Sequence, residues 1–429
     1  MTDRAWIDAA LTAARPQVIG ALLRYFRVLD AAEDAFQEAC LRALKNWPVK
    51  GPPRDPAAWL IFVGRNFALD ELRRRNKQTE LPPDDEIVTE PEDTQSELAE
   101  RLDASHYRDD ILRLLFVCCH PDLPAPQQIA VALRIVSGLT VREIARAFLV
   151  GESAMEQRIT RAKARINGAD VPFDTPGAPE RAERLVAVST MIYLLFNEGY
   201  SASGGNAHVR VPLCEEAVRL SRLLLRLFPA DPEVMGLNAL LLLQHARAAA
   251  RLDAESNIVL LEDQDRGLWS RELIAEGLTL VEKALRHHRP GPYQLQAAIA
   301  AVHAQAARAS DTDWAEIDQL YQVLESVQPS PVVTLNRAVA VSKLRGAADA
   351  LAMIEPLEAK LGGYFYFFGL KGALLSQLNR PDEARVAFGR AIALANTAAE
   401  AAHIRLHLDR LQKDSDHAQG ARAHAAKRS

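Results

Sequence analysis

The chain has 429 residues, of which 48% are hydrophobic, and this is enough apolar surface for two or three packed domains. Leu and Ala predominate over β-branched residues and only 6% of the residues are aromatic, so we predict an all-helical protein. The longest apolar run, residues 185–196, is too short to span a bilayer, and the sequence contains no secretion signal. These features exclude a membrane protein and predict a cytoplasmic one with reduced thiols.

The net charge of −5 is unevenly distributed. Residues 1–79 carry 13 Lys and Arg against 9 Asp and Glu, and residues 111–167 carry 8 against 4. Between them, residues 80–110 carry 2 basic residues against 12 acidic ones, a Pro-containing composition that cannot form a core. We therefore predict two basic helical modules, at 1–79 and 110–168, joined by a flexible acidic linker at 80–109.

The first module contains a predicted helix from Asp30 to Leu44, opened by the capping-box spacing of Asp30 and Glu33. Phe36, Cys40 and Leu44 recur at the spacing of a buried helix face. Another face is polar except for one leucine, and by spacing alone it would be an ordinary solvated surface: Asp34, Gln37, Glu38, Leu41 and Lys45.

A second helix is predicted after the Pro-rich connector at 48–53, because Asp55 and Pro56 suit the N-cap and first positions of a helix. It ends in three arginines, Arg73, Arg74 and Arg75. These would be favourable at the negative end of the helix dipole, and they would equally suit a DNA backbone.

The second module contains the most informative stretch of the chain. Thr140 with Glu143, and Ser153 with Glu156, have the capping-box spacing and predict two short helices with Gly151 in the turn between them. This is the pattern of a helix-turn-helix.

On the second of these helices, one face is predicted to be buried because its apolar residues recur at helical spacing: Met155, Ile159, Ala162 and Ile166. The far side is polar, with Ser153, Glu156, Gln157, Thr160 and Arg161. The flanks are cationic, with Arg158, Lys163 and Arg165. Such a helix suits the major groove of DNA.

A Pro- and Gly-rich break at 171–179 precedes a large helical region at 180–412, and a polar tail at 413–429 is predicted to be disordered. At a shift of 34 residues, segment 336–357 aligns with 370–391 and pairs small or apolar residues. This period is typical of tetratricopeptide (TPR) repeats, which stack into a solenoid. For residues 180–330 a repeat and an irregular bundle both stay open.

We find no nucleophile–base pair, phosphate-binding loop or zinc-ligand pattern, and we expect no metal or cofactor. Cys118 and Cys119 read as small buried hydrophobes, and His403 and His407 as surface histidines without a third ligand. The segment 197–201 reads as a helix end with Gly199 at the C-cap, although a regulatory contact there stays open.

The first module resembles region 2 of the extracytoplasmic-function (ECF) sigma factors of the sigma-70 family, in EDAFQE at 33–38, WL at 59–60 and RNFALDELRRR at 65–75. The helix-turn-helix, with Arg161-Ala162-Lys163 near its end, is similar to their region 4. The linker stands where housekeeping sigma factors carry region 3. The C-terminal region resembles the ECF subgroup with a long TPR-like extension, in FNEGYSA at 196–202, GPYQLQAAIAAVHA at 291–304 and LNRAVA at 335–340.

The resemblance implies a sigma subunit without a catalytic site of its own, which directs core RNA polymerase to promoters. The partners would be promoter DNA and the polymerase core, through the β′ clamp helices and the β flap. Asp34, Gln37, Glu38 and Leu41 would bind the clamp helices. The −10 element would be captured by Arg54, Trp59, Arg65, Asn66, Arg73, Arg74 and Arg75, although the Pro-rich connector leaves its base preference unreadable. The −35 element would be bound by Ser153, Glu156, Gln157, Arg158, Thr160, Arg161, Lys163 and Arg165. The extension would regulate in cis, in place of a membrane anti-sigma factor, or bind a protein partner.

Two other functions fit the same modules. The chain could be a one-component transcription regulator whose repeats sense a ligand or partner, and such a regulator would bind operator DNA without polymerase. It could also be a repeat-based adaptor with a vestigial DNA module, although the basic flanks of the recognition helix argue against that.

Overall fold

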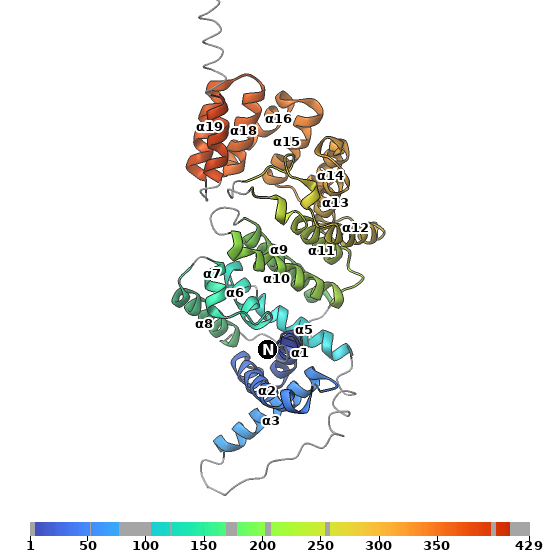
Figure 1. Cartoon of the computed structure of the whole chain (residues 1–429), viewed down its shortest axis with the longest axis vertical. Coiled ribbons are helices and arrows are strands. Elements are labelled where there is room, and N and C mark those ends of the chain that lie inside the picture. The colour runs from blue at the N-terminus through green and yellow to red at the C-terminus, as the bar shows by residue number, and fades with distance from the viewer. Residues whose placement is uncertain are drawn as a thin grey trace, which may run out of the picture. The chain divides into compact units, whose positions relative to one another are not determined.

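The structure is a computed structural model of the chain, and it describes residues 5–51, 53–76, 104–120, 122–148, 150–168, 178–201, 207–253, 258–395 and 400–411. Over these ranges the named elements are all helices, and the sole β feature is an isolated bridge between Leu252 and Ile258 (Figure 1). The predicted all-α class is confirmed. None of the helices described is long and apolar enough to cross a membrane.

The chain divides into two compact units, residues 1–195 and 196–429. The first begins with three helices that pack against one another: α1 (Ala5–Phe26), α2 (Leu29–Lys50) and α3 (Pro56–Asn76). Their core includes three tryptophans. Trp47 is buried and stacks on Trp6 at a ring-centroid distance of 5.9 Å, and Trp59 meets its edge at 5.4 Å. Aromatic pairs in this arrangement stabilise a core beyond the area that they bury.

Helix α2 differs from the prediction at both ends. It begins at Leu29, and its N-cap residue, Val28, makes no side-chain hydrogen bond. The prediction of a capping box formed by Asp30 and Glu33 is therefore wrong. It continues through Pro48 to Lys50 instead of ending at Leu44. The buried face runs through Ala32, Phe36, Ala39, Ala43 and Trp47, whereas Leu44 is 39% exposed. Small alanines form this face because α2 packs closely against both α1 and α3.

Four further helices follow in the first unit: α5 (Ala104–Cys118), α6 (Ala125–Ile135), α7 (Val141–Ala147) and α8 (Glu152–Gly168). Helix α5 begins at Ala104, inside the segment 80–109 that we predicted to be a flexible linker. The rest of that linker, residues 171–177 of the predicted break at 171–179, and the predicted tail at 413–429 lie outside the described residues.

The helix-turn-helix forms as predicted, with one correction. Thr140 and Glu143 close the capping box, since the Thr140 amide donates to Glu143 at 2.8 Å and the Glu143 amide to the Thr140 hydroxyl at 3.2 Å. Helix α8 starts at Glu152, one residue before Ser153. Ser153 therefore lies inside the first turn and is not the N-cap.

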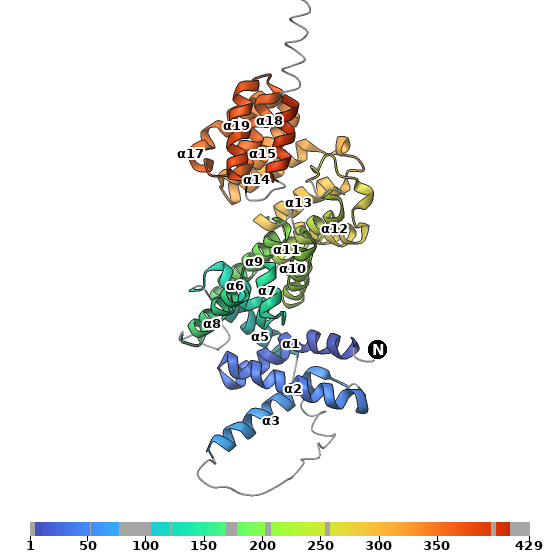
Figure 2. The ribbon, with the colours of Figure 1, turned by 60° about the vertical axis from the view of Figure 1, so that its left-hand side comes forward.

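The second unit takes the end of α9 (Ala178–Ser201) and continues as a series of helices in which neighbours along the chain pack together (Figure 2). These are α10 (Ala207–Leu227), α11 (Pro232–His245), α12 (Arg271–Leu285), α13 (Pro292–Gln305), α14 (Trp314–Val327), α15 (Pro331–Arg345), α16 (Ala347–Ile354), α17 (Glu358–Leu361), α18 (Phe365–Gln377) and α19 (Pro381–Leu394). Short 3₁₀ turns occur at Ala248–Ala250, Arg266–Leu268, Ala309–Asp311 and Glu355–Leu357, and residues 400–411 are also helical. Packing of successive helices is the architecture of a TPR-like solenoid.

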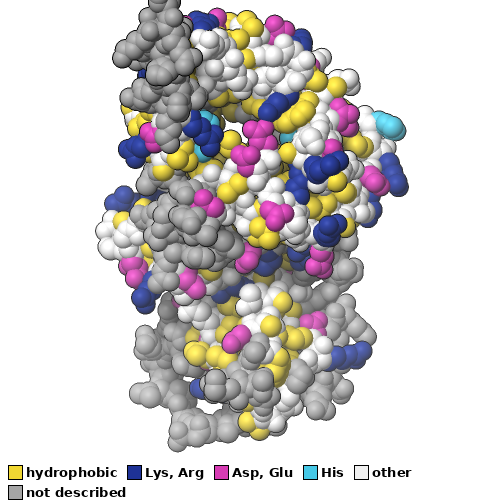
Figure 3. Space-filling view, turned by 45° about the horizontal axis from the view of Figure 1, so that its top comes forward, with side chains coloured by type: hydrophobic (Ala, Val, Ile, Leu, Met, Phe, Trp, Pro, Cys, Tyr) yellow, Lys and Arg dark blue, Asp and Glu magenta, His cyan; other side chains and the backbone are white. Residues whose placement is uncertain are grey.

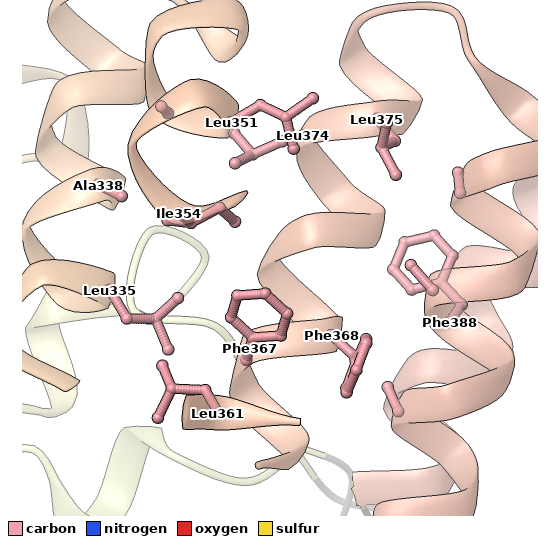
Figure 4. Close-up of a cluster of buried hydrophobic side chains, with 14 of the residues drawn as sticks. Leu335, Ala338, Leu351, Ile354, Leu361, Phe367, Phe368, Leu374, Leu375 and Phe388 are labelled. Carbon is pink, nitrogen blue, oxygen red and sulfur yellow. The ribbon is translucent and has the colours of Figure 1, made fainter. Parts of the chain in front are cut away.

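The 34-residue repeat corresponds to two helical hairpins, α15 with α16 and α18 with α19. Ile354 and Phe388, which the alignment pairs, both lie in the shared hydrophobic core (Figure 4). Of the paired Ala338 and Gly372, Ala338 is buried in the same core, and Gly372 lies at a close helix crossing, since a Cβ there would fall 2.5 Å from the Phe388 ring. The predicted repeat is confirmed in its core positions.

Two smaller predictions change. Gly199 lies inside α9, where an added Cβ would come within 2.8 Å of the Cys214 sulfur, so it permits a close helix contact and is not a C-cap. His403 and His407 are half-buried instead of lying on the surface, and His407 stacks on Phe388 at 5.5 Å.

Cys118 and Cys119 are buried as predicted, and burial raises the pKa of Cys119 to about 12. Within the described ranges, no group of three or more His, Cys, Asp or Glu could hold a metal ion.

Candidate nucleic-acid interface

Helix α8 separates its two faces as the sequence predicts. Met155, Ile159, Ala162 and Ile166 are buried and hold the helix on the module. The opposite face is exposed: Ser153, Glu156, Gln157, Thr160 and Arg161. Because the buried stripe holds α8 on the module, the amide, hydroxyl and guanidinium groups of the opposite face are presented together to solvent. These are the groups that contact base edges in a major groove.

The cationic flanks of α8 are not equally accessible. Arg158 is partly buried, and Arg165 is exposed with its guanidinium donating to the Asp122 carbonyl at 2.9 Å. Lys163 is only 18% exposed, because its ammonium group contacts α2: it lies 3.1 Å from Asp30 Oδ1 and donates to the Glu33 carboxylate.

The contact changes the electrostatics of Lys163. Burial lowers its pKa, but hydrogen bonds and charges from Glu33 and Asp30 outweigh that effect, so the pKa is raised overall. In this arrangement Lys163 is a charged partner of region 1–79 and is not presented to a ligand. Asp30 and Glu33 have capping-box spacing, and the same spacing places both carboxylates on one side of the first turn of α2, where Lys163 binds them.

A second surface lies on α2. Asp34, Gln37 and Leu41 are exposed, and Leu41 is 53% exposed among polar neighbours. Glu38 is partly buried and binds Arg42 at 3.0 Å. Leu41 stays exposed because the opposite face of α2 is packed in the core. A large exposed apolar side chain of this kind is a feature of protein-binding surfaces.

The predicted −10 residues are placed differently from one another. Arg54 is exposed, and Arg65 and Asn66 are partly buried on α3, with the Arg65 guanidinium 4.8 Å from the Tyr25 ring centroid. Trp59 is only 6% exposed and packs on Trp47. Arg73, Arg74 and Arg75 lie on α3, but their side chains are outside the described residues.

Helix α3 is positioned by the predicted cap. The Asp55 carboxylate accepts from the Ala58 amide at 3.0 Å, and Pro56 is the first helical residue. Gly64 allows α2 to approach, since a Cβ there would lie 3.0 Å from the Ala35 carbonyl.

Comparison with known families accounts for both modules. Residues 11–78 match the model of sigma-70 region 2, and residues 113–166 match that of sigma-70 region 4. The chain is 31% identical over 155 residues, 33% of its length and 53% of the relative's, to the ECF RNA polymerase sigma factor BldN of Streptomyces coelicolor. The chain belongs to the ECF sigma factors of the sigma-70 family. Core RNA polymerase and promoter DNA are therefore the partners of this sigma factor.

The C-terminal extension is shared with a second relative. An uncharacterised protein of Rhizobium meliloti is 69% identical over 411 residues, 96% of this chain and 97% of its own. Residues 184–285 match a family of unknown function, DUF6596. Among solved structures, yeast Tom70 aligns with 96% of the chain and 85% of its own, at 13% identity and a TM-score of 0.36.

Proposed function

We propose that this sigma factor binds the β′ clamp helices of core polymerase through Asp34, Gln37, Glu38 and Leu41 on α2. The observation that carries the proposal is the exposed Leu41 within an acidic face whose opposite side is fully packed. The sigma factor contributes no catalytic group of its own, and it works in the cytoplasm, where polymerase and DNA meet. A contact of region 4 with the β flap belongs to the same proposal.

Region 4 then binds the −35 element through the exposed face of α8, and region 2 captures the melted −10 element. In this proposal Arg54, Arg65 and Asn66 contact the strand, and Arg73, Arg74 and Arg75 continue the cationic track along α3. A cationic track is what a single strand requires, because its backbone dominates the binding energy. Trp59 supports this surface indirectly, because its buried ring packs against Trp47 and so holds α3 on α2.

Charge reversal on α2 tests core binding. The variant Asp34→Lys with Glu38→Lys should lose co-purification with core polymerase, because both carboxylates lie on the proposed contact face. Asp8→Lys, an exposed acidic residue on α1, is the matched control and should bind core normally. The circular dichroism spectrum should be unchanged in both variants. Retained core binding by the double variant would refute the assignment of this face of α2 to polymerase binding.

We also propose that the C-terminal extension acts in cis on regions 2 and 4. The relative of 69% identity supports this, because regions 2 and 4 and the extension occur there in one chain of similar length. A protein partner would bind in the groove of about 630 Å³ between α14, α15 and α18, which Trp314, Tyr321 and Lys343 line. On the face seen in Figure 3, acidic and basic side chains are intermixed over the C-terminal helices, so the surface favours no single charge.

Truncation after Gly168 tests the role in cis. We expect the yield of run-off transcript to fall relative to the full chain, because in this proposal regions 2 and 4 need the extension in the same chain for full activity. Circular dichroism of the truncated chain is the control for folding. Unchanged activity and unchanged promoter choice would mean that the extension serves another partner.

A further inference from the structure

Regions 2 and 4 are joined in the first unit by a compact set of charged contacts. On α2, Asp30 and Glu33 lie about one turn apart, and on α8 Lys163 and Asn167 do the same. Lys163 binds both carboxylates, and the Asn167 side-chain amide donates to Asp30 Oδ2 at 3.2 Å. Two residues of the recognition helix are thus held by two residues of region 2.

Arg15 adds a second contact from α1. Its guanidinium donates to the carbonyls of Ile135 at 2.9 Å and Arg134 at 3.2 Å, at the end of α6, where the helix dipole favours a cation. It also lies 3.5 Å from Glu33. Glu33 is therefore shared between a cation of its own region and one of region 4.

Three of these charges are shielded from solvent, whereas the Asp30 side chain is 55% exposed. The Glu33, Arg15 and Lys163 side chains are 5%, 13% and 18% exposed. Ion pairs at such burial are screened by salt much less than surface pairs. Removing one partner leaves a buried charge without compensation, so the set behaves as one unit.

The helices behind these charges also touch. A Cβ at Gly20 of α1 would lie 2.6 Å from the Asp110 carbonyl oxygen of α5, and Arg24 lies 3.6 Å from the Asp110 carboxylate. Regions 2 and 4 are therefore in direct contact and are not merely tethered.

This contact is incompatible with binding both promoter elements. Elements centred at −35 and −10 are about 25 base pairs apart, or about 85 Å along B-DNA at roughly 3.4 Å per base pair. Two touching modules of this size, each with a radius of gyration of about 11 Å, place their centres only about 30 Å apart. Residues 77–103, which connect the modules covalently, reach about 90 Å at most when extended, so the chain permits separation.

We propose that Asp30, Glu33 and Arg15 form a latch that holds the recognition helix through Lys163 and Asn167 in the free protein. The latch must open before regions 2 and 4 bind the two promoter elements together. Opening releases Lys163 from α2, and the freed ammonium then contacts a DNA phosphate. The inference rests on the proposed assignment of region 2 to the −10 element and of region 4 to the −35 element.

Distance measurement on the full chain tests the latch directly. Spin labels at Asn46→Cys on α2 and Arg142→Cys on α7, both exposed positions, are introduced in a Cys40→Ser background because the other three cysteines are buried. The unmodified latch should give one short distance. Asp30→Asn with Glu33→Gln should shift most of the population to longer distances, whereas Asp8→Asn should leave the distance unchanged.

DNA binding without core polymerase supplies a second readout, on a duplex carrying the −35 element. Asp30→Asn with Glu33→Gln should bind about three- to thirty-fold more tightly than the unmodified chain, because Lys163 is then free to contact a phosphate and no binding energy is used to release it from α2. Lys163→Met should lengthen the distance in the same way, yet bind DNA no more tightly than the unmodified chain, because it also removes the phosphate contact.

The outcomes separate the latch from the proposed function. The same short distance in all variants, or a long distance in the unmodified chain, would overturn the latch. An Arg161→Ala variant that binds the −35 duplex with unchanged affinity would instead overturn the DNA-binding assignment, whatever the distances show. Circular dichroism of each variant confirms that it is folded.

Discussion

At the scale of single residues, the exposed face of α8 separates base reading from phosphate binding. Arg161 lies on the exposed face, and Arg158 on its partly buried flank. A guanidinium that reaches a base edge discriminates between sequences, whereas one on a phosphate does not. The two arginines therefore have different expected roles although they lie three residues apart.

Replacing Arg161 by Ala should cost about 1–3 kcal/mol on the specific promoter and relax the preference at one −35 position. Arg158→Ala is the matched variant and should weaken all sequences alike, with a salt slope reduced by about one. Fluorescence anisotropy with core-bound protein, on promoter and random duplexes at several salt concentrations, measures both effects. An equal loss on specific and random DNA for Arg161→Ala would refute the base-reading role.

Residue patterns predicted those structural features that depend only on residues close together in the sequence. The buried stripe of α8 and the box of Thr140 with Glu143 are local, since a helix brings residues three and four apart together wherever it forms. Asp30 and Glu33 show the limit. Their spacing fits a capping box, but their partner Lys163 lies 130 residues beyond Glu33, and nothing local indicates it.

At the scale of elements, close helix crossings depend on small residues. Gly372 on α18 faces the buried Phe388 ring, whereas Gly389 on α19 is exposed and an added Cβ there would meet nothing within 4 Å. The repeat alignment predicted that the small residue at position 372 lies where two helices cross, and the contact with Phe388 confirms this. The end of α2 was not predicted, because Pro48 is expected to break a helix. The helix continues to Lys50, and Trp47 in its last turns packs between Trp6 and Trp59.

Gly372→Ala should lower the free energy of unfolding by about 1–3 kcal/mol, because the ring that it meets is buried and must shift within a packed core. Gly389→Ala should raise it by about 0.5–1 kcal/mol, because alanine loses less backbone entropy in a helix. Urea unfolding followed by circular dichroism compares the two. Equal effects of the two substitutions would contradict the packing described for this hairpin.

At the scale of the whole molecule, two sigma modules and a helical extension occur in one chain. The all-α class, the helix-turn-helix and the repeat were predictable because each rests on periodicity and motif spacing within one segment. Both sigma regions were predictable because their motifs resemble those of a known family. The direct contact between regions 2 and 4 was not, since it joins surfaces that each look solvated when read alone. The predicted domain boundaries at 79, 109, 168 and 180 stay predictions.

Run-off transcription with purified core polymerase free of other sigma factors tests the central claim most directly, on the DNA upstream of this protein's own gene. We expect a transcript of one defined length only when the full chain and core are both present. The Asp34→Lys/Glu38→Lys variant should abolish it, and Asp8→Lys should not. Promoter-specific DNA binding by the chain alone, without any transcript when core is added, would contradict the account and indicate a one-component regulator instead.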